Sequence, residues 1–142
     1  MQIVLKGLII GQDSYNDDVL YKENSSSPYS SGIGSTIQEK IENRDGVKNF
    51  CDYENSLGTD SNIIEDCSIR LYFTKEECTL EEADTALVDN LFGVFEVEKE
   101  LTGYSEFTIT GYDINKCEIG GHNLLDIILS HKDEYMILVM EW

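Results

Sequence analysis

Alternation of apolar and polar residues is the feature that most limits how this chain can fold. Residues 68–74, SIRLYFT, carry their large apolar side chains at every second position. Residues 94–101 and 105–112 repeat this pattern. Because successive side chains of a strand point to opposite faces, a period of two predicts strands with one buried face and one face in water.

Two of these segments form a predicted hairpin, because only a short connection around Gly103 separates residues 94–101 from residues 105–112. The alternation assigns the side chains of the first segment to two faces. The inward set is Phe95, Val97 and Leu101, and the outward set is Glu96, Glu98 and Glu100. Two further strands are predicted at residues 3–10 and 135–142, and the second of these is apolar on both faces, which is typical of a central strand.

Three helices are predicted from capping signals and apolar spacing. The first follows Thr36 and Glu39, which have the spacing of a capping box, and ends at Asp45. The second covers residues 79–93: it starts with a capping box and presents one apolar stripe, formed by Leu80, Ala83, Leu87 and Leu91. The third is short, covers residues 124–129 and is capped by Asn123 and Asp126.

The remaining segments are polar or lack a period. Residues 12–35 surround the single proline and predict a mobile polar loop or insertion, residues 47–66 are expected to be irregular, and residues 113–121 form a turn. The order of elements shows no βαβ alternation. We therefore predict a single α+β domain, residues 1–142, with a mixed, mostly antiparallel sheet of about five strands and two or three helices packed on it.

The charge of the chain limits its partners. It has 28 Asp and Glu against 10 Lys and Arg, a net charge of −18. Residues before Leu71 hold 12 acids and 6 bases, whereas the rest hold 16 acids and 4 bases. Such a field repels nucleic acid and anionic membranes and attracts basic protein surfaces. The sequence thus predicts a basic protein as partner, with no direct binding to nucleic acid or membrane.

The acids are densest between residues 76 and 100. Six tyrosines along the chain are expected in loops or at strand ends among acids: Tyr15, Tyr21, Tyr29, Tyr53, Tyr104 and Tyr112. Alternate positions on a strand lie about 6 to 7 Å apart on one face, so the outward glutamates form a row of like charge. Tyrosine suits interfaces because it combines contact area with a polar tip. The predicted partner-binding residues are Glu76, Glu77, Glu81, Glu82, Asp89, Glu96, Glu98, Glu100, Tyr104 and Glu106.

Reactive side chains give weaker signals. The four cysteines contain no C-x-x-C pair and are expected to be free thiols. Cys117, His122 and His131 are the residues that a small Cys/His enzyme or a zinc site would use, at a spacing that matches no common site. The sequence GIGST at residues 32–36 could cradle a phosphate ahead of a helix, but it lacks the P-loop lysine. We expect no catalytic residue, metal or cofactor.

In charge and size the chain is similar to phage-encoded inhibitors that imitate nucleic acid, such as anti-CRISPR and anti-restriction proteins. It is similar in the same way to bacterial immunity proteins that neutralise basic nuclease toxins. Both likenesses imply a non-enzymatic inhibitor that occupies a basic nucleic-acid-binding site on another protein. No apolar run reaches the roughly 18 residues of a membrane span and no basic leader is visible. We therefore expect a cytoplasmic protein, in the host cell if phage-encoded.

Overall fold

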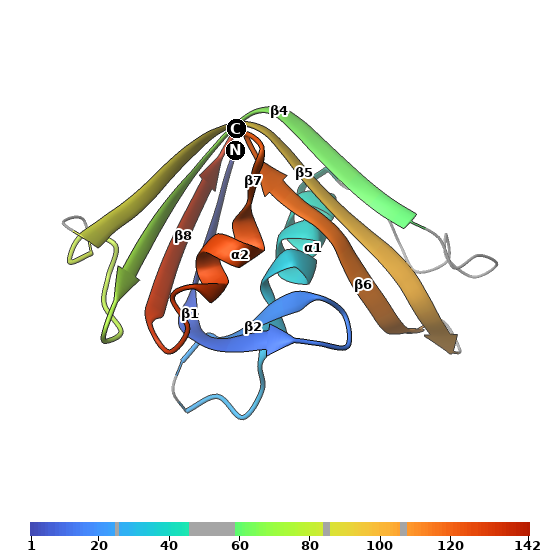
Figure 1. Ribbon diagram of the computed structural model, residues 1–142, viewed down its shortest axis with the longest axis horizontal. Coiled ribbons are helices and arrows are strands. Elements are labelled where there is room, and N and C mark those ends of the chain that lie inside the picture. The colour runs from blue at the N-terminus through green and yellow to red at the C-terminus, as the bar shows by residue number, and fades with distance from the viewer. Residues whose placement is uncertain (25, 46–58, 84–85, 106–107) are drawn as a thin grey trace.

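A computed structural model describes residues 1–24, 26–45, 59–83, 86–105 and 108–142. The side chains of residues 43–45, 60, 87–88, 103–105 and 108–110 are not described. Within these ranges the protein is mostly β, with one open sheet of eight antiparallel strands and two short helices (Figure 1). The sheet is therefore larger than the predicted five strands, and each described strand pair is antiparallel.

The strands are arranged in the order β3-β2-β1-β8-β4-β5-β6-β7. Their bounds are β1 Gln2–Asp13, β2 Asp18–Lys22, β3 Ser31–Gly32, β4 Thr59–Thr74, β5 Leu87–Ser105, β6 Thr108–Ile119, β7 His122–Asn123 and β8 Tyr135–Glu141. The helices are α1 Ile33–Asp45 and α2 Leu124–Leu129.

The sheet bends sharply across β4 and β5, which are 16 and 19 residues long. On one side of the bend, β4 residues 68–74 pair with β8 and with residues 87–92 of β5. On the other side, β4 residues 59–64 pair with β5, which continues alongside β6. We call these halves the β8 lobe and the β6 lobe. They slope away from the bend like the sides of a tent, with both helices beneath it (Figure 1).

Two glycines allow the backbones to meet at the bend. Gly93 of β5 has φ +131°, and Gly120, in the turn after β6, has φ +56°. A Cβ on Gly93 would lie 2.9 Å from the Gly120 Cα, and a Cβ on Gly120 would collide with the Phe92 carbonyl oxygen. The Gly120 N–H donates to the Val94 carbonyl at 3.0 Å. Larger residues would therefore be excluded here both by backbone conformation and by lack of space.

The main core fills the space between the two lobes and the helices. Helix α1 contributes Ile33, Ile37 and Ile41, spaced four apart on one face and at most 1% exposed. Helix α2 contributes Leu124, Leu125 and Ile128. These side chains belong to the same buried cluster as the inward residues of the sheet, so hydrophobic burial holds the helices under the bend.

A second, smaller cluster covers the outer face of the β8 lobe. Residues 75–83 cross this face, where Ala83 is fully buried and Leu80 packs beside it. The sheet residues beneath are Tyr72, Tyr135, Ile137 and Val139. Strand β8 lies between β1 and β4 and is buried from Tyr135 to Met140, which confirms the prediction of a central strand.

The predicted helix over residues 79–93 is wrong. Its capping box forms, because Thr79 and Glu82 exchange hydrogen bonds and the Ala83 N–H donates to the Thr79 carbonyl at 3.0 Å. One more turn follows, in which the Ala86 N–H donates to the Ala83 carbonyl at 2.8 Å, and β5 then begins at Leu87. From there the chain pairs with β4, so Leu91 enters the core from a strand. Long-range ladder formation has overridden a local helix signal.

Three other expectations also need correction. The polar segment 12–35 contains β2 and β3 and the start of α1. Residues 59–66 belong to β4 rather than to irregular structure, whereas residues 46–58 lie outside the described residues. Asp113 and Asn115 lie within β6, and the turn is confined to Gly120 and Gly121.

The remaining elements agree with the sequence patterns. Strand β1 and the strand over residues 68–74 are present, and β5 pairs antiparallel with β6 as predicted. The predicted connection around Gly103 is wrong, because Gly103 lies within β5 and stands opposite Gly111. Helix α2 begins after Asn123, whose side-chain oxygen accepts from the Asp126 N–H at 3.1 Å. Helix α1 ends at Asp45 as expected but starts at Ile33, ahead of the predicted cap, since the Thr36 hydroxyl donates to the Gly32 carbonyl instead.

The bend gives a first prediction. Gly120→Ala should lower the free energy of unfolding by on the order of 1–3 kcal/mol, because it combines a strained φ with a collision against the Phe92 carbonyl. Gly121→Ala is the matched control: its φ is +82°, and a Cβ there would have no atom within 4 Å. Urea denaturation should give the larger loss for Gly120→Ala. Equal losses would show that backbone conformation alone decides the cost.

Candidate functional site

The outward face of β5 and β6 carries five carboxylates among the described side chains. Its carboxylates are Glu96, Glu98, Glu100, Asp113 and Glu118. The predicted inward set of β5 is confirmed, since Phe95, Val97 and Leu101 are buried while Glu100 is exposed and Glu96 and Glu98 are half-buried. We call this surface the acidic face.

Strand pairing brings like charges together on this face. The register sets Glu96 opposite Glu118 and Glu100 opposite Asp113. Only Glu98 stands opposite a base, Lys116, whose Nζ lies 3.3 Å from a Glu96 oxygen. This ion pair raises the pKa of Lys116 above its ordinary value. Like charges directly opposite one another destabilise a sheet, so fold stability gives no reason for this arrangement.

The strand on the other side of β5 adds no charge to the acidic face at the paired positions. Ile63, Ser61 and Thr59 of β4 stand opposite Glu96, Glu98 and Glu100 in turn. The acids therefore form a band two strands wide. Among its described side chains Lys116 is the single base, which leaves the band strongly negative.

The remaining predicted residues do not join this band. Glu76, Glu77, Glu81 and Glu82 are exposed on the connection that covers the outer face of the β8 lobe. Asp89 stands opposite buried Leu71 and so lies on the inward face at the edge of that lobe. Tyr104 is in β5, but its side chain is not described, and Glu106 lies outside the described residues. The bend thus divides what the sequence presents as one acidic run.

The sequence analysis missed a buried polar cluster centred on Asp18 of β2. This carboxylate is fully buried and accepts hydrogen bonds from the backbone N–H groups of Gly34, at 2.8 Å, and Ser35, at 3.1 Å. It also accepts from the Val19 N–H at 2.9 Å and from the Tyr112 hydroxyl at 3.3 Å. Asp18 therefore caps α1 from a neighbouring strand, where the helix dipole favours a negative charge.

Lys99 completes this cluster from β5. It is 7% exposed, and its Nζ donates to the Ser35 hydroxyl at 3.0 Å and lies 4.7 Å from the centroid of the Tyr112 ring. Burial, opposed by its hydrogen bonds, raises the pKa of Asp18 above 3.8. Burial and the Asp18 charge raise the pKa of Tyr112. The cluster ties α1 to both lobes; the only sequence signal for it was a lysine on an apolar strand face.

The Asp18 carboxylate also accounts for the glycines of GIGST. A Cβ on Gly32 would collide with an Asp18 oxygen, and one on Gly34 would lie 3.1 Å from the other oxygen. The N–H groups that would hold a phosphate at this helix start already bind a carboxylate of the chain itself. The phosphate-loop interpretation is therefore wrong at this position.

The candidate metal and thiol residues are separated. The described residues include no group of three or more His, Cys, Asp or Glu side chains that could hold a metal ion. Cys117 is buried on β6, His122 is exposed on β7, and His131 stacks on Phe73 and lies 2.5 Å from a Glu134 oxygen. Burial raises the pKa of the Cys117 thiol, which disfavours the thiolate that a nucleophile or metal ligand needs. Cys67, Cys78 and Cys117 are free, and Cys51 lies outside the described residues.

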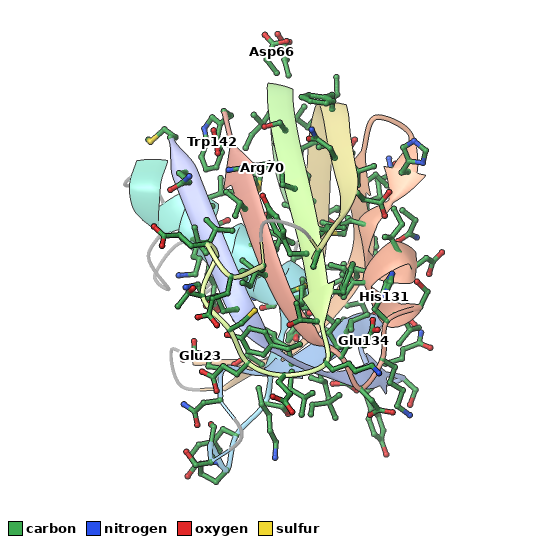
Figure 2. All side chains as sticks on the ribbon, turned by 90° about the vertical axis from the view of Figure 1, so that its left-hand side faces the viewer. Glu23, Asp66, Arg70, His131, Glu134 and Trp142 are labelled. Atoms are coloured by element: carbon green, nitrogen blue, oxygen red, sulfur yellow. The ribbon has the colours of Figure 1, made fainter. Side chains whose placement is uncertain are left out.

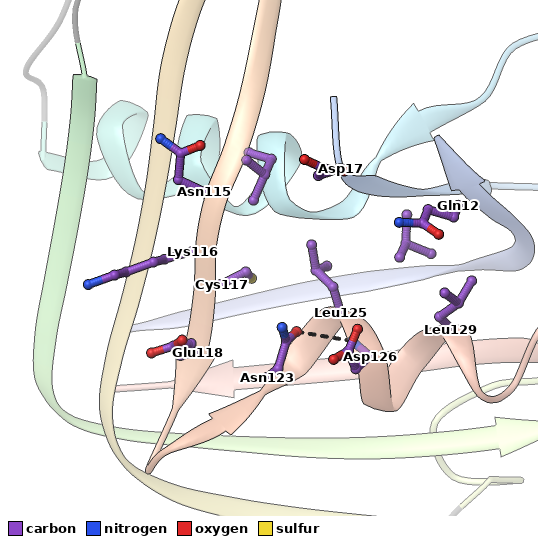
Figure 3. A pocket seen from close by; sticks show the side chains of 12 residues that line it. Gln12, Asp17, Asn115, Lys116, Cys117, Glu118, Asn123, Leu125, Asp126 and Leu129 are labelled. Atoms are coloured by element: carbon purple, nitrogen blue, oxygen red, sulfur yellow. Dashed lines mark hydrogen bonds between the residues drawn. The ribbon is translucent and has the colours of Figure 1, made fainter. Parts of the chain in front are cut away.

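A small polar cleft of about 240 Å³ lies between β6, α2 and the turn after β1 (Figure 3). Asp17, Glu118 and Asp126 line it, and the side chain of Asn123 is engaged as the cap of α2. The buried Cys117 is the only thiol among the described lining residues. Lys116 is the single Lys or Arg among the described lining residues, and its Nζ pairs with Glu96 on the acidic face.

Comparisons with known proteins return no matching family model, no similar curated protein and no similar solved structure. In the part of the chain that the structure describes, no helix has the length and apolar character to cross a membrane.

The Asp18 cluster gives a stability prediction. Asp18→Ala should lower the free energy of unfolding by on the order of 2–4 kcal/mol, because each buried N–H left without an acceptor costs about 1–3 kcal/mol. Glu23→Ala, which removes an exposed acid just after β2, is the control and should change stability little. Urea denaturation measures both. A loss no larger than that of the control would show that water replaces the carboxylate.

The raised pKa of Asp18 adds a pH prediction. The folded chain holds this proton more tightly than the unfolded chain, so the group's contribution to stability is fully present below pH 3.8 and is lost as the pH rises through the folded pKa. Asp18→Asn does not titrate. The free energy of unfolding of wild type relative to Asp18→Asn should therefore fall in urea titrations as the pH rises above 3.8 and through the folded pKa. A rise over this range would show that the hydrogen bonds to the ionised carboxylate outweigh its burial.

Proposed function

We propose that this protein is an acidic inhibitor that occupies a basic, nucleic-acid-binding site on another protein. The observation that carries the proposal is the acidic face, where Glu96 opposes Glu118 and Glu100 opposes Asp113. A row of like charge is held there at fixed spacing by two paired strands. Such an arrangement suits binding to a surface of complementary charge better than it suits folding.

The remainder of the chain supports the same kind of partner. The net charge of −18 raises the rate of encounter with a basic surface, and the rate falls as salt screens the charges. Once docked, Glu96, Glu98 and Glu100 would pair with Lys and Arg side chains of the partner and exclude its natural polyanion. The sheet fixes the backbone beneath these residues, so little backbone entropy is lost on binding.

Two kinds of partner fit this chemistry. A nucleic-acid-guided or restriction nuclease would be blocked by a mimic of its substrate, and a nuclease toxin would be neutralised by an immunity protein. Both present a basic cleft, so the acidic face serves either one. The Cys/His enzyme is the less favoured alternative, because Cys117 is buried and the described His residues lie elsewhere.

The proposal predicts which acids matter. Glu96→Gln, Glu98→Gln and Glu100→Gln together should slow association with a basic partner, most at low salt, while folding stays intact or improves slightly as like-charge repulsion is relieved. The matched control is Glu76→Gln, Glu77→Gln and Glu81→Gln. It removes the same number of charges from the β8 lobe and should associate with the partner faster than the triple variant of the acidic face does.

The measurement uses partners captured from lysate on immobilised wild-type chain and then eluted with double-stranded DNA. Elution by DNA identifies partners bound through a nucleic-acid site. Surface plasmon resonance at two ionic strengths then compares wild type and both triple variants. Partners that DNA fails to elute, or equal association rates for the two variants, would contradict the proposal.

A further inference from the structure

We propose that a groove at the bend of the sheet anchors an arginine side chain of the basic partner. The groove measures about 610 Å³ and is lined by residues from both ends of the chain and from β4 and β5. Met1, Asp66, Ser68, Phe92, Glu141 and Trp142 are among its lining residues. This inference rests on the proposed function and identifies the part of the interface that would supply specificity.

Strand register explains why a hollow forms here. Ser68 of β4 stands opposite Phe92 on one side and opposite Glu141 on the other. A small side chain therefore lies between two large ones in the same row, and Gly93 next to Phe92 adds no bulk. Asp66 and Trp142 lie at this same end of the sheet, with Arg70 just below them (Figure 2).

The groove is bordered by apolar side chains that remain in water. Phe92 is 66% exposed and Met1 60% exposed. Two further apolar side chains lie beside the bend: Val94 of β5 is 50% exposed, and Ile63 of β4, which stands opposite Glu96, is 61% exposed. Apolar side chains gathered on an exposed surface and rimmed by polar groups are typical of interaction sites.

Charge decides the chemistry of the occupant. Asp66 is exposed, and its carboxylate has no hydrogen-bond or ion-pair partner among the described residues. Glu141 pairs with Arg70 at 2.7 Å but keeps 44% of its side chain exposed. The acidic face begins just beyond Val94, at Glu96. A planar cation suits aromatic rings and carboxylates together. Arginine fits both better than lysine, because its planar guanidinium can stack on an aromatic ring and can donate two parallel hydrogen bonds to a carboxylate.

The test uses two probes of equal length and charge, an oligo-arginine and an oligo-lysine peptide. Trp142 is the single tryptophan of the chain, so its fluorescence reports on the groove directly. At low salt both peptides should bind wild type, and oligo-arginine should bind about threefold to tenfold more tightly and change the Trp142 emission. Phe92→Ala should abolish this preference and leave the affinity for oligo-lysine nearly unchanged.

Two control variants separate the groove from the acidic face. Tyr29→Ala removes an aromatic ring that is 80% exposed elsewhere and should keep the arginine preference. The triple variant Glu96→Gln, Glu98→Gln, Glu100→Gln should lower the affinity for both peptides by a similar factor. Because each changed side chain is at least partly exposed, circular dichroism should show an unchanged fold for all three variants.

Each failure has its own meaning. Equal affinities of wild type for the two peptides, or an arginine preference that survives Phe92→Ala, would overturn the groove as an anchor while leaving the acidic face in place. No binding of either peptide would overturn the proposed function and this inference with it. A wild-type dimer in sedimentation that Phe92→Ala converts to monomer would assign the groove to a second copy of the chain and overturn the inference.

Discussion

The close approach of two glycine backbones at the bend is the constraint on which the rest of the structure depends. Gly93 and Gly120 meet at a distance that a Cβ would not permit, and β5 passes from one lobe to the other at this point. Because β4 and β5 belong to both lobes, their bend creates the space that α1 and α2 fill. It also exposes Phe92 and forms the groove beside it.

The chain uses its acids in two different ways. Asp18 is buried, and its charge is offset by helix N–H groups and the Tyr112 hydroxyl, with Lys99 bound to Ser35 nearby. Its role is structural, because it joins β2 to the start of α1 through hydrogen bonds. The acids of the acidic face have little internal compensation beyond Lys116 and the Asn115 amide, which donates to Glu100 at 3.2 Å. Folding does not require this repulsive surface, and the proposed external partner rests on that observation.

The capping box at residues 79–82 shows how far local signals extend. Thr79 and Glu82 bond as a capping box should, yet the chain enters strand β5 at Leu87. Isolated helices of this length are marginal, whereas residues 87–92 gain a full ladder with β4. The opposite case is α1, where buried isoleucines four apart agreed with the tertiary packing and a helix formed, although it starts at Ile33, ahead of the predicted cap.

The sequence by itself determined which face of its strand each alternating residue takes. A period of two places Glu96, Glu98 and Glu100 on one face of the strand and Phe95 and Val97 on the other, in any sheet. It likewise determined the central place of β8, whose residues are apolar on both faces. Only the tertiary structure decided the partners across strands and the bend. Pairing of Ser68 with both Phe92 and Glu141, and capping of α1 by Asp18, join segments distant in sequence. Such contacts depend on register and close packing, which local periodicity does not encode.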